Sequence, residues 1–147
     1  MSTGLGFTAF AWIGSHPWLY PMLESAHIVG VALLVGNLVL LELRVWGHAA
    51  ELPIGALARL ALAVSVAGFC LLGTTGLLMF AAAPQELLGN RIFLIKMALV
   101  ALAGFNALAF HLRRGLQRLD RVARAQTALS LGLWLAVIIC GRWIAYA

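Results

Sequence analysis

The chain has 147 residues, of which 63% are hydrophobic and only 10% charged, and its formal net charge is +5 at pH 7. Soluble domains average about 45–50% apolar and about 25% charged residues, so this chain has too few polar groups to cover a water-facing surface. The composition excludes a soluble globule, a disordered linker and a collagen-like fibre, and it predicts an integral membrane protein with one domain over residues 1–147.

The N-terminal stretch is apolar but short, and Pro17 and Pro21 interrupt it. It lacks the positively charged start of a signal peptide. Trp12, Trp18 and Tyr20 suit the headgroup layer of a bilayer, where amphipathic rings settle. We expect a short interfacial helix here, followed by the first membrane span.

Four segments of the chain are long enough to cross a bilayer. A transmembrane helix needs about 20 mostly apolar residues. The segments that qualify cover residues 22–43, 57–80, 92–110 and 127–146. Because lipid offers no partners for unpaired backbone groups, spans of this length are helices. The expected fold class is therefore all-α, an integral membrane four-helix bundle embedded in the lipid bilayer.

The basic residues predict how the bundle is oriented. Five of the ten lie between the third and fourth spans: Arg113, Arg114, Arg118, Arg121 and Arg124. A basic cluster between two apolar runs is typical of a cytoplasmic loop rather than of a nucleic-acid site. With this loop inside, the cations divide seven to three in favour of the inner side. We expect a bacterial inner-membrane protein with both termini in the periplasm.

Polar residues converge on the outer third of the predicted bundle. Glu24 and His27 lie one turn apart on one face of the first span. By helix rise, His27 and Lys96 share a depth, each roughly 9 Å below the outer end of its span. The second span adds Thr74 and Thr75 at this level, and the fourth adds Arg142. Since ionisable groups are costly in a bilayer, we expect a ligand or cofactor site, the alternative being a structural network in which Glu24 pairs with Lys96.

A second polar set lies at the inner headgroup level. It consists of Arg44, His48 and His111. Side chains at this depth reach water at little cost, so a solvated position is the alternative to a functional role. Asn37 and Asn106 lie in mid-membrane, where hydrogen bonding between helices is expected.

Haem b is the cofactor that these residues suit best. No Walker loop, GxGxxG run, GxSxG elbow or CxxC pair is present. A haem needs an axial imidazole, an apolar slot and cations near its propionates. We expect His27 to ligate the iron. The expected propionate partners are Lys96, Arg91 and Arg142, and the expected slot is opened by Gly30, Gly73 and Gly76.

Several runs resemble the HemJ family of small membrane protoporphyrinogen oxidases. In the first helix they are His27-Ile28-Val29-Gly30, Glu42-Leu43-Arg44 and His48-Ala49-Ala50-Glu51, and in the third Ile95-Lys96-Met97 and Phe110-His111. CopD-type copper-resistance membrane domains look similar at a coarser level. The HemJ resemblance implies a four-helix bundle that binds haem b and oxidises protoporphyrinogen IX to protoporphyrin IX. It implies His27 as axial ligand and Lys96 as an essential polar partner.

The resulting hypothesis is a haem b-binding redox protein of the inner membrane, an oxidase of tetrapyrrole or quinol substrates in which Lys96 and Glu24 act on the substrate. The alternatives are a non-enzymatic membrane subunit or assembly factor, and a small metal- or solute-handling protein. The second axial ligand stays open between His16 and a five-coordinate iron. In a two-haem variant, His48 and His111 serve an inner haem. A homo-oligomer or a larger membrane complex is compatible with either reading.

Overall fold

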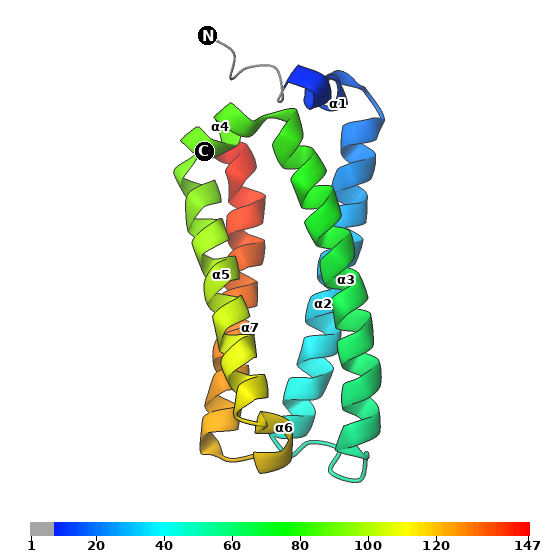
Figure 1. The fold of residues 1–147 in the computed structure, drawn as a ribbon, viewed down its shortest axis with the longest axis vertical. Helices are drawn as coiled ribbons and strands as arrows, with labels where there is room; N and C mark the ends of the chain where they lie inside the picture. Colours follow the sequence, from blue (N-terminus) through cyan, green and yellow to red (C-terminus); the bar gives the residue numbers. More distant parts are fainter. Residues whose placement is uncertain (1–7) are drawn as a thin grey trace.

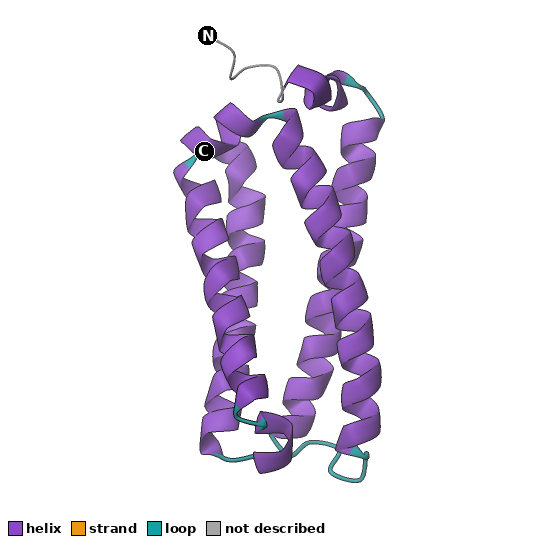
Figure 2. Ribbon diagram, in the orientation of Figure 1, coloured by secondary structure: helices purple, strands orange, loops and turns teal. Residues whose placement is uncertain are grey.

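The computed structural model describes residues 8–147, and these residues form helices and turns, with no strand among them (Figure 2). In chain order the elements are η1 (Thr8–Phe10), α1 (Ala11–Ser15), α2 (Leu19–Val45), α3 (Ile54–Ala82), α4 (Pro84–Gly89), α5 (Arg91–Leu112), α6 (Gly115–Arg118), α7 (Arg121–Trp143) and η2 (Ile144–Tyr146). Four of them, namely α2, α3, α5 and α7 continued by η2, are long and apolar enough to cross a membrane. The predicted all-α four-helix bundle is confirmed, and its long helices are those of a multi-pass membrane protein.

The two ends of the bundle differ in charge. We call the end with α1, α4 and the chain's C-terminus the outer end, and the end with α6 and residues 46–53 the inner end (Figure 1). All five arginines of the segment 113–124 lie at or next to α6, and Arg44 and Arg59 flank the connection 46–53. Arg44 ties this connection to α2, since its Nε donates to Leu52 O at 2.9 Å and its Nη2 to Ala50 O at 3.1 Å. The basic loops therefore share one end, as the sequence predicts.

The helices extend beyond the predicted spans. α7 begins at Arg121 rather than at Thr127, because Asp120 caps it: Asp120 Oδ1 accepts a hydrogen bond from Ala123 N at 2.8 Å. A carboxylate at this position satisfies a free backbone N–H and interacts favourably with the helix dipole. The charged first turn of α7 thus extends the helix outside the apolar segment.

Asp120 predicts a pH dependence of stability. Its hydrogen bond from Ala123 N and its ion pair with Arg113, at 3.2 Å, hold its pKa below the ordinary value of 3.8. A depressed carboxyl pKa stabilises the fold above the unfolded-state value and loses that contribution as pH falls through the folded-state value. We expect Asp120→Ala to lower the Tm at pH 7, and the difference from wild type to shrink below about pH 4. A difference that stays constant down to pH 2 would contradict this account.

The N-terminal segment enters the bundle through a short helix. The predicted interfacial helix is present as η1 and α1, and Trp18 after it is exposed. His16 Nδ1 accepts hydrogen bonds from the backbone N–H groups of Trp18 and Leu19, at 3.4 and 3.2 Å, and so caps α2. The prediction that Pro21 precedes the first span is wrong. Pro21 lies in the first turn of α2, where a missing N–H costs nothing.

The bundle is built from two helical hairpins. α2 packs closely along α3, and α5 along α7, and the hairpins meet chiefly through α2 and α7. The closest approach is at Gly30 and Gly68, where a Cβ on Gly30 would lie 2.7 Å from Leu72 N and a Cβ on Gly68 would lie 2.8 Å from Gly30 O. Small residues allow such backbone contact between membrane helices. The expectation that Gly30 opens a cofactor slot is therefore wrong, because α3 occupies that space.

Two apolar clusters join the hairpins. The central one contains Leu34 of α2, Ala103 of α5 and, from α7, Leu133, Trp134 and Val137. The second, at the inner end, contains Val45, Phe110 and Ala123. Asn106 also links α5 to α7, since its Nδ2 donates to Gln126 O at 2.8 Å, as predicted. Asn37 does not bridge helices but donates to Leu33 O on its own helix.

Candidate functional site

His27 and Thr75 form the polar contact between α2 and α3 in the outer half of the bundle. His27 Nδ1 lies 3.1 Å from Thr75 Oγ1. Thr75 is buried, whereas His27 is half-buried. The ring of His27 lies against Gly76, where a Cβ would come within 3.3 Å of its Cε1. Gly76 therefore provides room for the imidazole, rather than for a separate slot.

The hydrogen bonds of Thr75 support one tautomer of His27. The hydroxyl of Thr75 donates to Leu71 O at 2.8 Å, back along its own helix. A hydroxyl has one hydrogen, and with that hydrogen on Leu71 O we assign Thr75 Oγ1 as the acceptor of a hydrogen bond from His27 Nδ1–H. The lone pair of the neutral imidazole is then on Nε2. A histidine whose Nδ1–H is held in this way presents Nε2 as a ligand or proton acceptor.

Lys96 lies between α5 and α7 in the same half. A Cβ on Gly141 of α7 would lie 3.6 Å from Lys96 Nζ, so the ammonium group rests against that glycine. The predicted convergence is therefore present for His27 of α2 and Thr75 of α3, which are in contact, whereas Lys96 of α5 packs against α7.

Two other predicted outer residues, Glu24 and Arg142, lie at exposed positions. Glu24 is exposed, and the one ion pair in the described part of the chain joins Arg113 to Asp120, so Glu24 and Lys96 are not directly paired. Arg142 is exposed on α7, where its Nη2 donates to Tyr146 Oη at 2.7 Å. The guanidinium group of Arg142 therefore lies on the surface of the bundle rather than beside Lys96.

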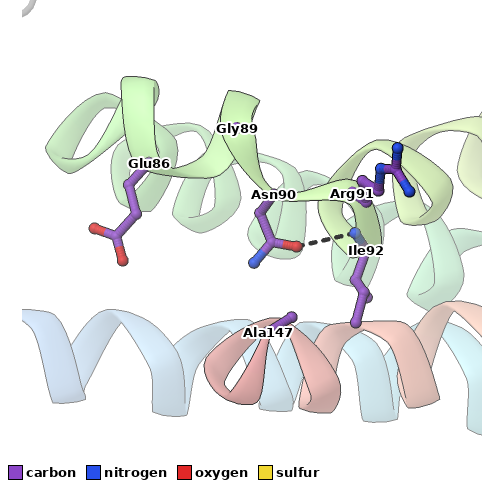
Figure 3. Close-up of a pocket in the computed structure, with 6 residues that line it drawn as sticks. All are labelled: Glu86, Gly89, Asn90, Arg91, Ile92 and Ala147. Carbon is purple, nitrogen blue, oxygen red and sulfur yellow. Dashed lines mark hydrogen bonds between the residues drawn. The ribbon is translucent and has the colours of Figure 1, made fainter.

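Arg91 borders a shallow pocket at the outer end. This pocket of about 380 Å³ is lined by α4, the start of α5 and Ala147. Figure 3 shows Glu86 and Arg91 on opposite sides of Asn90. The side chain of Asn90 is used structurally: Oδ1 accepts from Ile92 N at 2.9 Å, and Nδ2 donates to Ile144 O at 3.2 Å. The side chain of Asn90 thus joins the start of α5 to the last residues of the chain.

The inner histidines lie away from the outer site. His48 is exposed in the connection 46–53, and His111 is exposed near the end of α5. His111 packs edge-on against Phe110, with ring centroids 5.6 Å apart. No group of three or more metal-ligating side chains occurs among residues 8–147. The structure brings neither histidine to His27.

Sequence reasoning missed one buried acid. Glu42 of α2 is only 4% exposed, and its Oε2 has no hydrogen-bond partner within the described chain. In the sequence, Glu42 figures only in the run Glu42-Leu43-Arg44. The available signal was an acidic residue inside an apolar span, two positions before the first basic residue at its inner end.

No family model, curated protein or solved structure matches this chain. The resemblance to the HemJ family therefore remains a hypothesis that rests on the short runs quoted above. Functional inference depends on the geometry of the site.

The separation of Glu24 from Lys96 can be measured in the ligand-free protein. We expect the effects of Glu24→Gln and Lys96→Met on the free energy of unfolding to add within about 0.5 kcal/mol, as for residues that do not touch. The measurement is a double-mutant cycle in detergent. A coupling energy well above that value would show that the two side chains interact, as the structural alternative from the sequence requires.

Proposed function

We propose that this chain is a haem b-binding redox protein of the bacterial inner membrane, with His27 as an axial ligand. The observation that carries the proposal is the hydrogen bond between His27 and Thr75, which leaves Nε2 free for a ligand. Histidines that bind metals almost always donate their other ring N–H to a nearby acceptor. This proposal goes beyond the bundle itself, which supports only a membrane location.

The residues of the outer site fit a haem in their chemistry. His27 would hold the iron, and Thr75 holds the imidazole in the tautomer that ligation requires. Lys96 would supply a positive charge for a propionate. The attraction between the two charges is stronger inside the bundle than in water, because the dielectric constant there is lower. Bound haem supplies an iron that changes oxidation state by one electron. Arg91 and Arg142 are exposed and are not needed for this assignment.

The substrate class rests on the resemblance to HemJ. It favours a tetrapyrrole that carries carboxylates, for which Lys96 is the complementary cation, and a quinol is the alternative. The exposed Glu24 lies one turn from His27 towards the outer end. In this proposal Glu24 meets the substrate there, whereas Lys96 binds it within the bundle.

The visible spectrum of the detergent-purified protein tests the proposal. After expression with ample haem, we expect a Soret band that shifts and sharpens when dithionite is added. Protein that is folded but colourless under these conditions would overturn the haem assignment. It would favour the non-enzymatic subunit, which predicts co-purifying partners, or the transport protein, which predicts bound metal or substrate flux.

We further propose that the arginine-rich inner end faces the cytoplasm, since loops rich in Arg and Lys are retained there. In a variant without Cys70 and Cys140, we expect Glu86→Cys of α4 to react with an impermeant thiol reagent added to intact spheroplasts. Gln117→Cys of α6 should react only after the membrane is broken. Both of these positions are exposed. Labelling of Gln117→Cys in intact spheroplasts would reverse the orientation.

A further inference from the structure

A small cavity lies in the inner half of the bundle, on the opposite side of the central apolar cluster from His27. Its volume is about 50 Å³, and all four long helices line it. Six of the eleven residues that line it are polar: Glu42, Asn106, His111, Gln126, Thr127 and Ser130. Ionisable side chains are costly within membrane-spanning helices, and the lining contains two, Glu42 and His111.

Glu42 is the acidic residue that lines this cavity. It is 4% exposed, and its Oε2 lies without a hydrogen-bond partner in the described chain. Ser130, on α7, lines the same cavity and offers a hydroxyl as a partner for the carboxyl group. One neutral hydroxyl cannot satisfy two carboxylate oxygens, which together accept about four hydrogen bonds when ionised.

The nearby charged groups do not neutralise Glu42. Arg44, on the same helix, is bound to the carbonyls of the connection 46–53. Arg113, from the end of α5, is paired with Asp120 and also donates to Gln126 Oε1 at 3.2 Å. The remaining polar residues that α5 and α7 contribute to the lining are neutral except for His111, and α3 contributes only an apolar residue.

Water in the cavity would satisfy a protonated Glu42. Burying an ionised carboxylate without a counter-ion costs far more than burying the neutral acid. A neutral carboxyl group both donates and accepts, and ordered water provides partners for each role. A water molecule needs roughly 10–15 Å³ of such volume and two to four polar partners, so a cavity of this size has room for more than one.

We propose that this cavity is a hydrated proton-binding site, in which Glu42 takes up a proton that enters from the inner end past His111. His111 lines the cavity and is also exposed near the inner end of α5, so it connects the cavity to the surface of the bundle. A chain of acidic, histidine and water groups is the usual form of a proton relay in a membrane protein. The site is distinct from the outer site and does not depend on a bound haem.

Infrared spectroscopy of the haem-free full chain in lipid nanodiscs tests this inference. At pH 7 an exposed glutamate is ionised. We therefore expect wild type to show the carbonyl stretch of a protonated carboxylic acid, and Glu42→Gln, which keeps the shape of the side chain, to lose it. Glu24→Gln is the matched control on the same helix, and it should leave the band unchanged.

Water access is tested by transfer into D2O. We expect the Glu42 band to shift rapidly in wild type, and the shift to be slower in Ala107→Leu, which fills the cavity from α5. The inference is overturned if wild type shows no band that Glu42→Gln removes, or if that band does not shift in D2O. A carboxylate band that changes with sodium concentration would also overturn it, since the cavity would then hold a metal cation.

Discussion

Replacing His27 by alanine is expected to abolish the haem b spectrum while the bundle remains folded in the membrane. The variant removes the imidazole whose Nε2 is left free by the bond from Nδ1–H to Thr75. Thr75→Val should weaken haem binding by about 10- to 100-fold without abolishing it, as is typical when the partner of a ligating histidine is removed. Haem titrations followed by absorbance measure both effects.

The inner histidines provide the controls for this experiment. His48→Ala and His111→Ala should keep the reduced spectrum, because both residues lie towards the other end of the bundle. An unchanged spectrum in His27→Ala would contradict the assignment of His27 as axial ligand. Loss of about half of the haem in His111→Ala would instead support a two-haem arrangement with one site at each end.

Gly68→Ala is expected to destabilise the bundle strongly. Its Cβ would lie 2.8 Å from both Gly30 O and Leu34 N, and neither backbone atom can move without separating α2 from α3. Overpacking of this kind costs about 1–3 kcal/mol. We expect a lower Tm in detergent, measured by the loss of helical circular dichroism or by a thermal aggregation assay.

Gly73→Ala, on the same helix, is the matched control. A Cβ there meets nothing within 4 Å, so the substitution should be neutral or stabilise by up to about 1 kcal/mol through helix propensity. Equal losses of stability in the two variants would mean that the close contact at Gly68 does not hold the hairpin together.

The sequence predicts the bundle well because apolar length is a direct signal of membrane helices. It places all four spans and the short entry helix correctly, but it starts the last span at Thr127. The charged residues before Thr127 obscured a helix start whose determinant is a capping bond from Ala123 N to Asp120. The contacts of Gly68 could not be predicted from the sequence for another reason. Periodicity shows which residues share a helix face, but not which faces of two helices pack together.

The candidate site was predictable in part for the same reason. Counting helix rise from the outer end brings His27, Thr75 and Lys96 to one level, and the structure shows the contact between His27 and Thr75. Depth alone does not fix direction around the helix axis, so the alternative in which Glu24 pairs directly with Lys96 is wrong. Glu42 was overlooked because its burial depends on the packing of α7 against α2.

The hairpin organisation has a consequence for the order in which the protein is made. α2 and α3 are neighbours in sequence, and their tight contact at Gly30 and Gly68 needs no other part of the chain. This pair can therefore assemble while α5 is still being translated, since early segments fold first during synthesis. α7 is the last long helix to be made and the one that packs against α2. The bundle is complete only when α7 packs against α2, and Glu42 is buried only in the complete bundle.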